Sequence, residues 1–124
     1  SGKRGMPDRI VIIEDDEATR YAYERALATA GFRTASFQDY FAAAPILDQG
    51  GGALLLLDIK MPDGTPQGVS IAMMARRGRP NLPILFVTGF PELVRWIDND
   101  FGSVLMKPVD SDALINAVRA RLQS

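Results

Sequence analysis

In four places in this chain, a side chain that can take part in chemistry directly follows a run of apolar residues. Asp58 follows the run 53–57, which is typical of a strand buried on both faces of a parallel sheet. The acids Glu14-Asp15-Asp16 follow a first β-branched run, while Thr88 and Lys107 each follow a later one. Because the carboxyl ends of parallel strands meet at one edge of a sheet, we expect these groups to lie around Asp58.

The types of these residues favour phosphoryl chemistry with a hard metal ion. Clustered carboxylates without histidine are suited to Mg²⁺, which prefers oxygen ligands. A lysine and a hydroxyl facing the same ion can bind the oxygens of a phosphoryl group. A carboxylate with an open approach, here Asp58, can then act as the nucleophile and form an aspartyl phosphate.

Each of these residues also has an ordinary structural explanation. An acid after a strand is more often a helix cap, which applies to Asp15 or Asp16 taken alone. A single threonine such as Thr88 commonly serves a turn, and a single lysine such as Lys107 is commonly solvated. The functional interpretation therefore depends on their convergence at one edge of the sheet.

The elements that must position these groups alternate along the chain. Strands are predicted at residues 9–14, 32–37, 53–57, 82–88 and 104–106. Helices are predicted at residues 17–30, 39–49, 69–77, 92–99 and 111–122. This alternation predicts an α/β fold, a doubly wound five-stranded parallel sheet with helices on both faces.

The composition limits the classes of protein to consider. With 124 residues the chain is long enough for one domain, which we place at residues 6–124. Residues 1–5 are predicted to be a disordered leader or tag remnant, with Met6 as a native start. A net charge of -1 gives no indication of a nucleic-acid partner, and no apolar run is long enough to span a membrane. The absence of cysteine fits a cytoplasmic protein.

The order of these motifs resembles a response-regulator receiver domain of two-component signalling. The resemblance rests on Glu-Asp-Asp, Asp-Ile-Lys-Met-Pro, Thr-Gly and Lys-Pro, each after a predicted strand, and it covers about residues 9–122. It implies a flavodoxin-like, CheY-like fold with strand order 2-1-3-4-5. The segment 85–90 also resembles the Phe-Ala-Thr-Gly-Tyr motif of an alphaproteobacterial subgroup of often stand-alone receivers.

The resemblance assigns a metal site to this chain. It implies that Asp58 is the phospho-acceptor and that Mg²⁺ is the cofactor. Asp16 would ligate Mg²⁺ directly, and Asp15 would hold a metal-bound water. Asp58 and the backbone carbonyl of Lys60 would complete the protein's share of the ligands.

The resemblance also assigns the remaining contacts and the partners. Thr88 and Lys107 would bind the phosphoryl group, with Lys107-Pro108 as a cis peptide bond. The phosphoryl group would come from a sensor histidine kinase or a phosphotransfer protein, and the switch would act on an unknown downstream protein. The protein would be a monomer or a weak dimer, and not an enzyme with a separate substrate.

Three features depart from the family pattern. Val104 stands where receivers usually carry an aromatic switch residue, a role that Phe90 is in a position to take over. The segment between Thr88 and Lys107 leaves room for only a short fourth helix. The loop 63–68 is longer than the usual Met-Pro-x-x-x-Gly.

Two other functions remain open at this point. A Mg²⁺-dependent aspartyl phosphatase would use the same nucleophile, but it usually needs an acid where this chain has Lys60. A receiver-like module that binds partners without phosphorylation would not need the complete set of site residues that is present.

Among charged segments, Arg76-Arg77-Gly78-Arg79 is predicted to be a solvated helix end.

Overall fold

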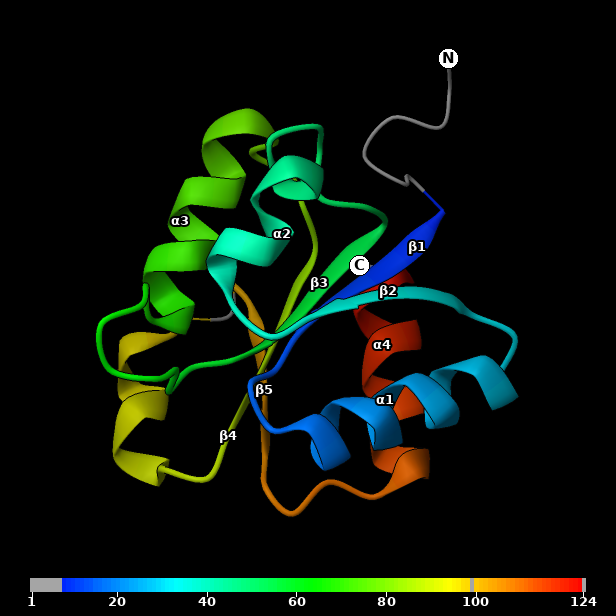
Figure 1. The fold of residues 1–124 in the computed structure, drawn as a ribbon. Helices are drawn as coiled ribbons and strands as arrows, with labels where there is room; N and C mark the ends of the chain where they lie inside the picture. Colours follow the sequence, from blue (N-terminus) through cyan, green and yellow to red (C-terminus); the bar gives the residue numbers. More distant parts are fainter. Residues whose placement is uncertain (1–7, 99, 124) are drawn as a thin grey trace.

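The computed structural model describes residues 8–98 and 100–123, which form one five-stranded parallel sheet with the strand order β2-β1-β3-β4-β5 (Figure 1). The strands are β1 (Arg9–Ile13), β2 (Arg33–Phe37), β3 (Leu54–Asp58), β4 (Ile84–Thr88) and β5 (Ser103–Met106). The helices are α1 (Glu17–Thr29), α2 (Tyr40–Leu47), α3 (Gly68–Gly78) and α4 (Ser111–Gln123), with a short 3₁₀ helix η1 (Pro91–Trp96). The predicted α/β fold and strand order are confirmed.

Helices cover both faces of the sheet, as predicted (Figure 1). On one face, α1 and α4 pack against each other and against the strands, around residues such as Leu27, Leu56 and Val118. On the other face, α2, α3 and η1 cover a second core that includes Leu55, Ile71 and Phe86. Apolar residues therefore point to both sides of the sheet, which explains the unbroken apolar runs of its strands.

The central strand β3 carries the residue of greatest chemical interest. All of its residues, from Leu54 to Asp58, are buried, and its neighbours β1 and β4 are almost as deeply enclosed. Burying one leucine side chain contributes about 2 kcal/mol, so this strand is firmly anchored in the core. Asp58 stands at the carboxyl end of that anchored segment.

Local signals account for where the main helices begin. The carboxylate of Asp16 accepts a hydrogen bond from the amide of Thr19 at the start of α1. Asp39 and Asp110 cap the amides of Ala42 and Ala113 in the same way. Such caps satisfy amides that have no partner inside the helix.

Two predictions about local structure were right only in part. The short helix expected at 92–99 is present as the 3₁₀ helix η1, which contains no buried residue. Of the arginines predicted to form a solvated helix end, Arg77 is exposed, whereas Arg76 and Arg79 are partly buried. Arg76 donates to the carbonyl of Leu82, and Arg79 donates to those of Gly50 and Gly52. Gly50 and Gly52 are distant from Arg79 in the sequence, and Leu82 lies in the loop after α3, so helical spacing does not reveal these contacts.

The predicted leader at residues 1–5 and the predicted start at Met6 lie outside the described residues. Within the described part of the chain, no helix combines the length and the apolar character that crossing a membrane requires.

Candidate functional site

The site is organised around Asp58, at the carboxyl end of β3. Its side chain is almost completely buried, with 7% of the residue exposed, between β1 and β4. One carboxylate oxygen, Oδ1, accepts a hydrogen bond from the backbone amide of Lys60 at 3.1 Å. The strand thus ends by holding its last carboxylate in a defined direction at the edge of the sheet.

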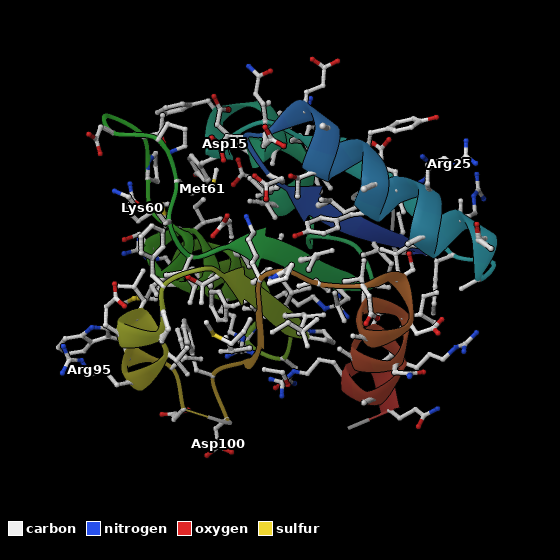
Figure 2. The ribbon with its side chains drawn as sticks, turned by 90° about the horizontal axis from the view of Figure 1, so that it is seen from below. Asp15, Arg25, Lys60, Met61, Arg95 and Asp100 are labelled. Carbon is white, nitrogen blue, oxygen red and sulfur yellow. The ribbon has the colours of Figure 1, made fainter. Side chains whose placement is uncertain are left out.

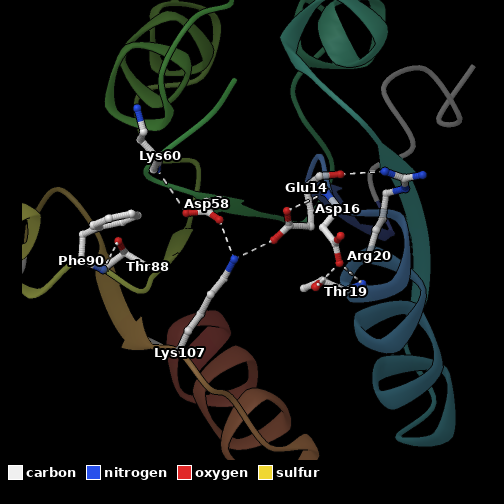
Figure 3. A network of polar contacts seen from close by, with 9 residues as sticks. All are labelled: Glu14, Asp16, Thr19, Arg20, Asp58, Lys60, Thr88, Phe90 and Lys107. Atoms are coloured by element: carbon white, nitrogen blue, oxygen red, sulfur yellow. Dashed lines mark hydrogen bonds and ion pairs between the residues drawn. The ribbon is translucent and has the colours of Figure 1, made fainter. Parts of the chain in front are cut away.

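Lys107 bridges Asp58 to a second acid (Figure 3). Its ammonium nitrogen lies 2.6 Å from Asp58 Oδ2 and 3.1 Å from Glu14 Oε1. Burial opposes the charge of Lys107, but the hydrogen bonds with Asp58 and Glu14 outweigh it and raise the pKa of the lysine. The predicted cis bond between Lys107 and Pro108 is present at this point.

Three acids meet here: ligand oxygens of Glu14, Asp15 and Asp58 lie within 4.8 Å of one another. Glu14 is buried and Asp15 is exposed, so the cluster reaches from the core to the surface. Burial raises the pKa of Glu14, against the lowering effect of the Asp16 amide and of Lys107. The ligand atoms are all oxygens, and Lys107 is the cation that contacts two of these acids. Such a set fits a hard divalent ion such as Mg²⁺.

Asp16, predicted to be a direct metal ligand, does not join this cluster. Its carboxylate accepts hydrogen bonds from both the amide and the hydroxyl of Thr19, at 2.9 and 2.6 Å. The hydroxyl and amide of Thr19 also lower the pKa of Asp16. The third acid of the cluster is Glu14, and the backbone amide of Asp16 donates to Glu14 at 3.0 Å.

The helix cap explains why Asp16 stands apart from the cluster. The residue just before a helix is its cap, and Asp16 stands there with Thr19 three residues later, so its carboxylate is used locally. Assigning the cap to Asp16 leaves Glu14 and Asp15 as the pair at the strand end. A helix cap is the ordinary explanation for Asp15 or Asp16 taken alone, and in the structure Asp16 is the cap.

Thr88 ends β4 beside Asp58 and is completely buried. Its hydroxyl oxygen accepts a hydrogen bond from the amide of Phe90 at 3.1 Å, and a hydroxyl that accepts one bond can still donate another. The ring of Phe90 is 45% exposed, whereas Val104 is only partly exposed and packs against the core around Phe86. The aromatic side chain at the rim of the site is therefore that of Phe90.

The site opens to solvent through a hollow at the carboxyl edge of the sheet. Lys60 and Met61, on the loop after β3, and Asp15, after β1, are seen at this edge in Figure 2. The hollow is lined by Asp15, Asp58, Lys60, Met61, Pro62, Asp63, Gly89, Phe90 and Lys107. Of the predicted groups, Asp15, Asp58, Lys60 and Lys107 thus line one accessible place. Thr88 is buried, and Asp16 lies outside the acid cluster.

The sequence of this chain matches the family described as the response regulator receiver domain over residues 10–119. The chain belongs to that family. Its fold and the arrangement of acids, threonine and lysine described above are in keeping with this membership.

Known proteins similar to this receiver span different lengths. The response regulator receiver protein CpdR of Brucella abortus (strain 2308) is 33% identical over 117 residues, which make up 92% of this chain and 96% of that protein. The swarming motility regulation protein RssB of Serratia marcescens is 33% identical over 114 residues, which make up 90% of this chain but 51% of that protein. Receiver sequences of this kind therefore occur both nearly alone and within longer regulators.

A solved structure supports the fold. The response regulator receiver protein from Sinorhizobium medicae WSM419 has 27% sequence identity and a TM-score of 0.81, with 94% of each chain covered. This receiver is thus a domain of the two-component response-regulator class, whose members generally act as signalling switches.

Proposed function

We propose that this protein is a phospho-accepting switch that takes a phosphoryl group on Asp58, with Mg²⁺, from a histidine kinase or a phosphotransfer protein. The observation that carries the proposal is the convergence of Lys107 on Asp58 and on buried Glu14, with Asp58 and Lys107 lining a hollow open to solvent. A carboxylate at the end of a rigid strand, beside a fixed cation, is suited to attack phosphorus.

The chemical step follows from these contacts. An oxygen of Asp58 attacks the phosphorus of a phosphohistidine, the P–O bond forms, and the P–N bond breaks as its electron pair leaves with the imidazole nitrogen. Lys107 already lies 2.6 Å from Asp58, so its ammonium group is placed to bind a phosphoryl oxygen. The Thr88 hydroxyl would donate to another oxygen, since it accepts from the Phe90 amide and keeps its own proton to donate.

Glu14, Asp15, Asp58 and the backbone carbonyl of Lys60 are the groups that would hold Mg²⁺. Bound there, the ion would neutralise the charge that develops on the transferring phosphoryl group. Asp15 is the exposed member of the cluster, and so the protein offers the ion an entrance from solvent. Hydrolysis would return the carboxylate: water attacks phosphorus, the Asp58 P–O bond breaks, and phosphate leaves.

The phosphoryl donor needs a surface next to Asp58. A second hollow lies beside Lys107, between α1 and the start of the loop that leads to α4, and includes Ala22, Tyr23 and Val109. A mostly apolar surface at the rim of the phosphoryl site is suited to an apolar face of the donor protein. The conformational signal to a downstream protein would pass through Phe90 and the helix η1, which follow Thr88 in the chain.

The direct test is the intact mass after incubation with acetyl phosphate and MgCl₂. We expect a gain of one phosphoryl group, about 80 Da, that is absent with EDTA and absent in Asp58→Asn. Absence of the adduct in the wild-type protein would contradict the proposal and would favour a module that binds partners without phosphorylation. A catalytic turnover of acetyl phosphate without an adduct would instead favour the phosphatase alternative.

A crossed pair of variants tests the assignment of the acids. We expect Asp15→Ala to abolish the increase in stability that Mg²⁺ produces, which is about 1.4 kcal/mol when the ion is at ten times its dissociation constant. Asp16→Ala should lower stability by about 1 kcal/mol through loss of the cap, yet keep the full increase with Mg²⁺. Urea unfolding of both variants, with and without MgCl₂, measures these effects. The reverse pattern would restore Asp16 as the metal ligand.

A further inference from the structure

The side chain of Gln67 is turned toward the loop that leaves β3. Its Oε1 accepts a hydrogen bond from the amide of Met61 at 2.8 Å, and its Nε2 donates to the carbonyl of Met61 at 3.1 Å. Nε2 also lies 3.4 Å from the carbonyl oxygen of Thr65. One amide side chain thus holds both backbone groups of Met61.

This use of Gln67 is unusual for its place in the chain. It precedes the first residue of α3, where a side chain would ordinarily cap the helix, yet its side chain makes no cap hydrogen bond. The next residue, Gly68, donates its amide to the carbonyl of Ile59 at 2.8 Å. A Cβ at Gly68 would clash with the carbonyl oxygen of Asp58, so the start of α3 is pressed against the end of β3. The longer loop is therefore closed at its base, with Gln67 inside it.

The geometry of the peptide bond links this contact to the site. The amide of Met61 and the carbonyl of Lys60 belong to one peptide unit, which is planar and trans. In such a unit the N–H and C=O bonds point in opposite directions. When Gln67 fixes the direction of the Met61 N–H, it also fixes the Lys60 carbonyl on the side away from Gln67. The amide of Lys60 is itself held by Asp58 Oδ1, at the other end of that residue.

We infer that Gln67 is a positioning residue for the metal site, acting through the Lys60 carbonyl. Lys60 and Met61 line the same hollow as Asp15 and Asp58, so a rotation of their shared peptide unit would move a ligand at the site. The inference depends on the proposed function, in which that carbonyl binds Mg²⁺. Groups that orient a metal ligand typically change metal affinity by about 10–100-fold when they are removed.

The experiment compares Gln67→Met with Thr65→Val in calorimetric titrations with MgCl₂ and with CaCl₂. Gln67→Met keeps the length of the side chain but loses the contacts with Met61. Thr65→Val is the matched control, because it removes a hydrogen bond to Pro62 in the same loop and leaves the Met61 contacts in place. Mg²⁺ demands nearly ideal octahedral geometry, whereas Ca²⁺ accepts flexible coordination.

We expect Gln67→Met to weaken Mg²⁺ binding about tenfold, to weaken Ca²⁺ binding by a smaller factor, and to leave the far-UV circular dichroism unchanged. Thr65→Val should bind both ions as the wild type does. Unchanged Mg²⁺ affinity in Gln67→Met would overturn the inference, and so would an equal loss for both ions. A wild type that binds no Mg²⁺ would overturn the proposed function itself, which separates the two failures.

A measurement on the wild type keeps the inference testable if the variant does not fold. We expect hydrogen exchange at the Met61 amide to be slow in the metal-free protein, because Gln67 holds it. Exchange of that amide at the rate of an unprotected one would overturn the inference without any substitution.

Discussion

The two edges of the sheet use charged side chains in opposite ways. At the amino edge, Arg76 makes two hydrogen bonds to the carbonyl of Leu82, and Arg79 donates to the carbonyls of Gly50 and Gly52. Both arginines are cations that bind neutral backbone groups, and these hydrogen bonds hold the loops before β3 and β4 in place. At the carboxyl edge, Lys107 meets Asp58 and Glu14, so that charge faces charge.

The difference separates a structural edge from a chemical one. The guanidinium groups of Arg76 and Arg79 donate to backbone carbonyls and so satisfy acceptors that would otherwise lack a partner. At the carboxyl edge three acids are clustered and Lys107 contacts two of them, Glu14 and Asp58, which leaves capacity for a further cation. Like charges held so closely oppose folding unless a cation offsets them, and a bound divalent ion would do so. Hydrogen bonds from cations to neutral carbonyls thus stabilise one edge, whereas the excess of clustered carboxylates prepares the other for binding a cation.

The largest expected effect is at the carboxyl edge. Lys107→Met should lower the free energy of unfolding by about 3 kcal/mol in metal-free buffer, because it leaves Glu14 and Asp58 buried without their cation. Lys60→Met is the control, since Lys60 pairs only loosely with exposed Asp63 at 3.6 Å, and its loss should cost less than about 0.5 kcal/mol. Urea unfolding at pH 7 measures both. Equal effects of the two variants would remove the distinction between a buried and a surface lysine.

A smaller effect is expected at the amino edge. Arg76→Met should lower stability by about 2 kcal/mol, because the carbonyl of Leu82 loses both bonds and the ring of Phe101 loses the guanidinium group 5.2 Å away. Mg²⁺ should stabilise this variant as much as it stabilises the wild type. The exposed neighbour Arg77, changed to Met, should alter stability by less than about 0.5 kcal/mol. A change in the effect of Mg²⁺ in Arg76→Met would show that the two edges are coupled.

The smallest effect concerns pH. Burial raises the pKa of Tyr23, close to the carboxyl edge, to about 12. The folded state therefore keeps a proton that the unfolded state loses near pH 10, so this contribution to stability is complete below pH 10 and is lost as the pH rises toward 12. Between pH 8 and pH 11 the wild type should lose about 1 kcal/mol more stability than Tyr23→Phe. If the free energy of unfolding falls equally with pH in the two proteins, the raised pKa of Tyr23 is contradicted.

Several features of the fold and site followed from sequence patterns. The unbroken apolar run before Asp58 predicted a central parallel strand, because only a strand covered on both faces is apolar throughout. The order of strands and helices then brought Asp58, Thr88 and Lys107 to one edge. Caps were also predictable, since their spacing is local, as with Asp110 before α4.

The choice among the acids was less accessible to sequence reasoning. Glu14, Asp15 and Asp16 are adjacent, and their composition does not distinguish a ligand from a cap. The start of α1 separates them in the structure: the cap position uses Asp16, whereas Glu14, directly after β1, is buried and paired with Lys107. Asp16, the predicted direct ligand, thus caps α1 in the structure, while Glu14 lies with Asp15 and Asp58 in the acid cluster.

The sequence by itself determined the periodic features of this protein: its alternating elements, its two-sided core and the strand ends that carry Asp58, Thr88 and Lys107. These depend on neighbours along the chain, and so their spacing records them. Only the tertiary structure decided the contacts of Arg76 with Leu82, of Lys107 with Glu14, and of Gln67 with Met61. Each joins a flexible side chain to a group whose place is set by packing, and no local pattern specifies where such a side chain finds its partner.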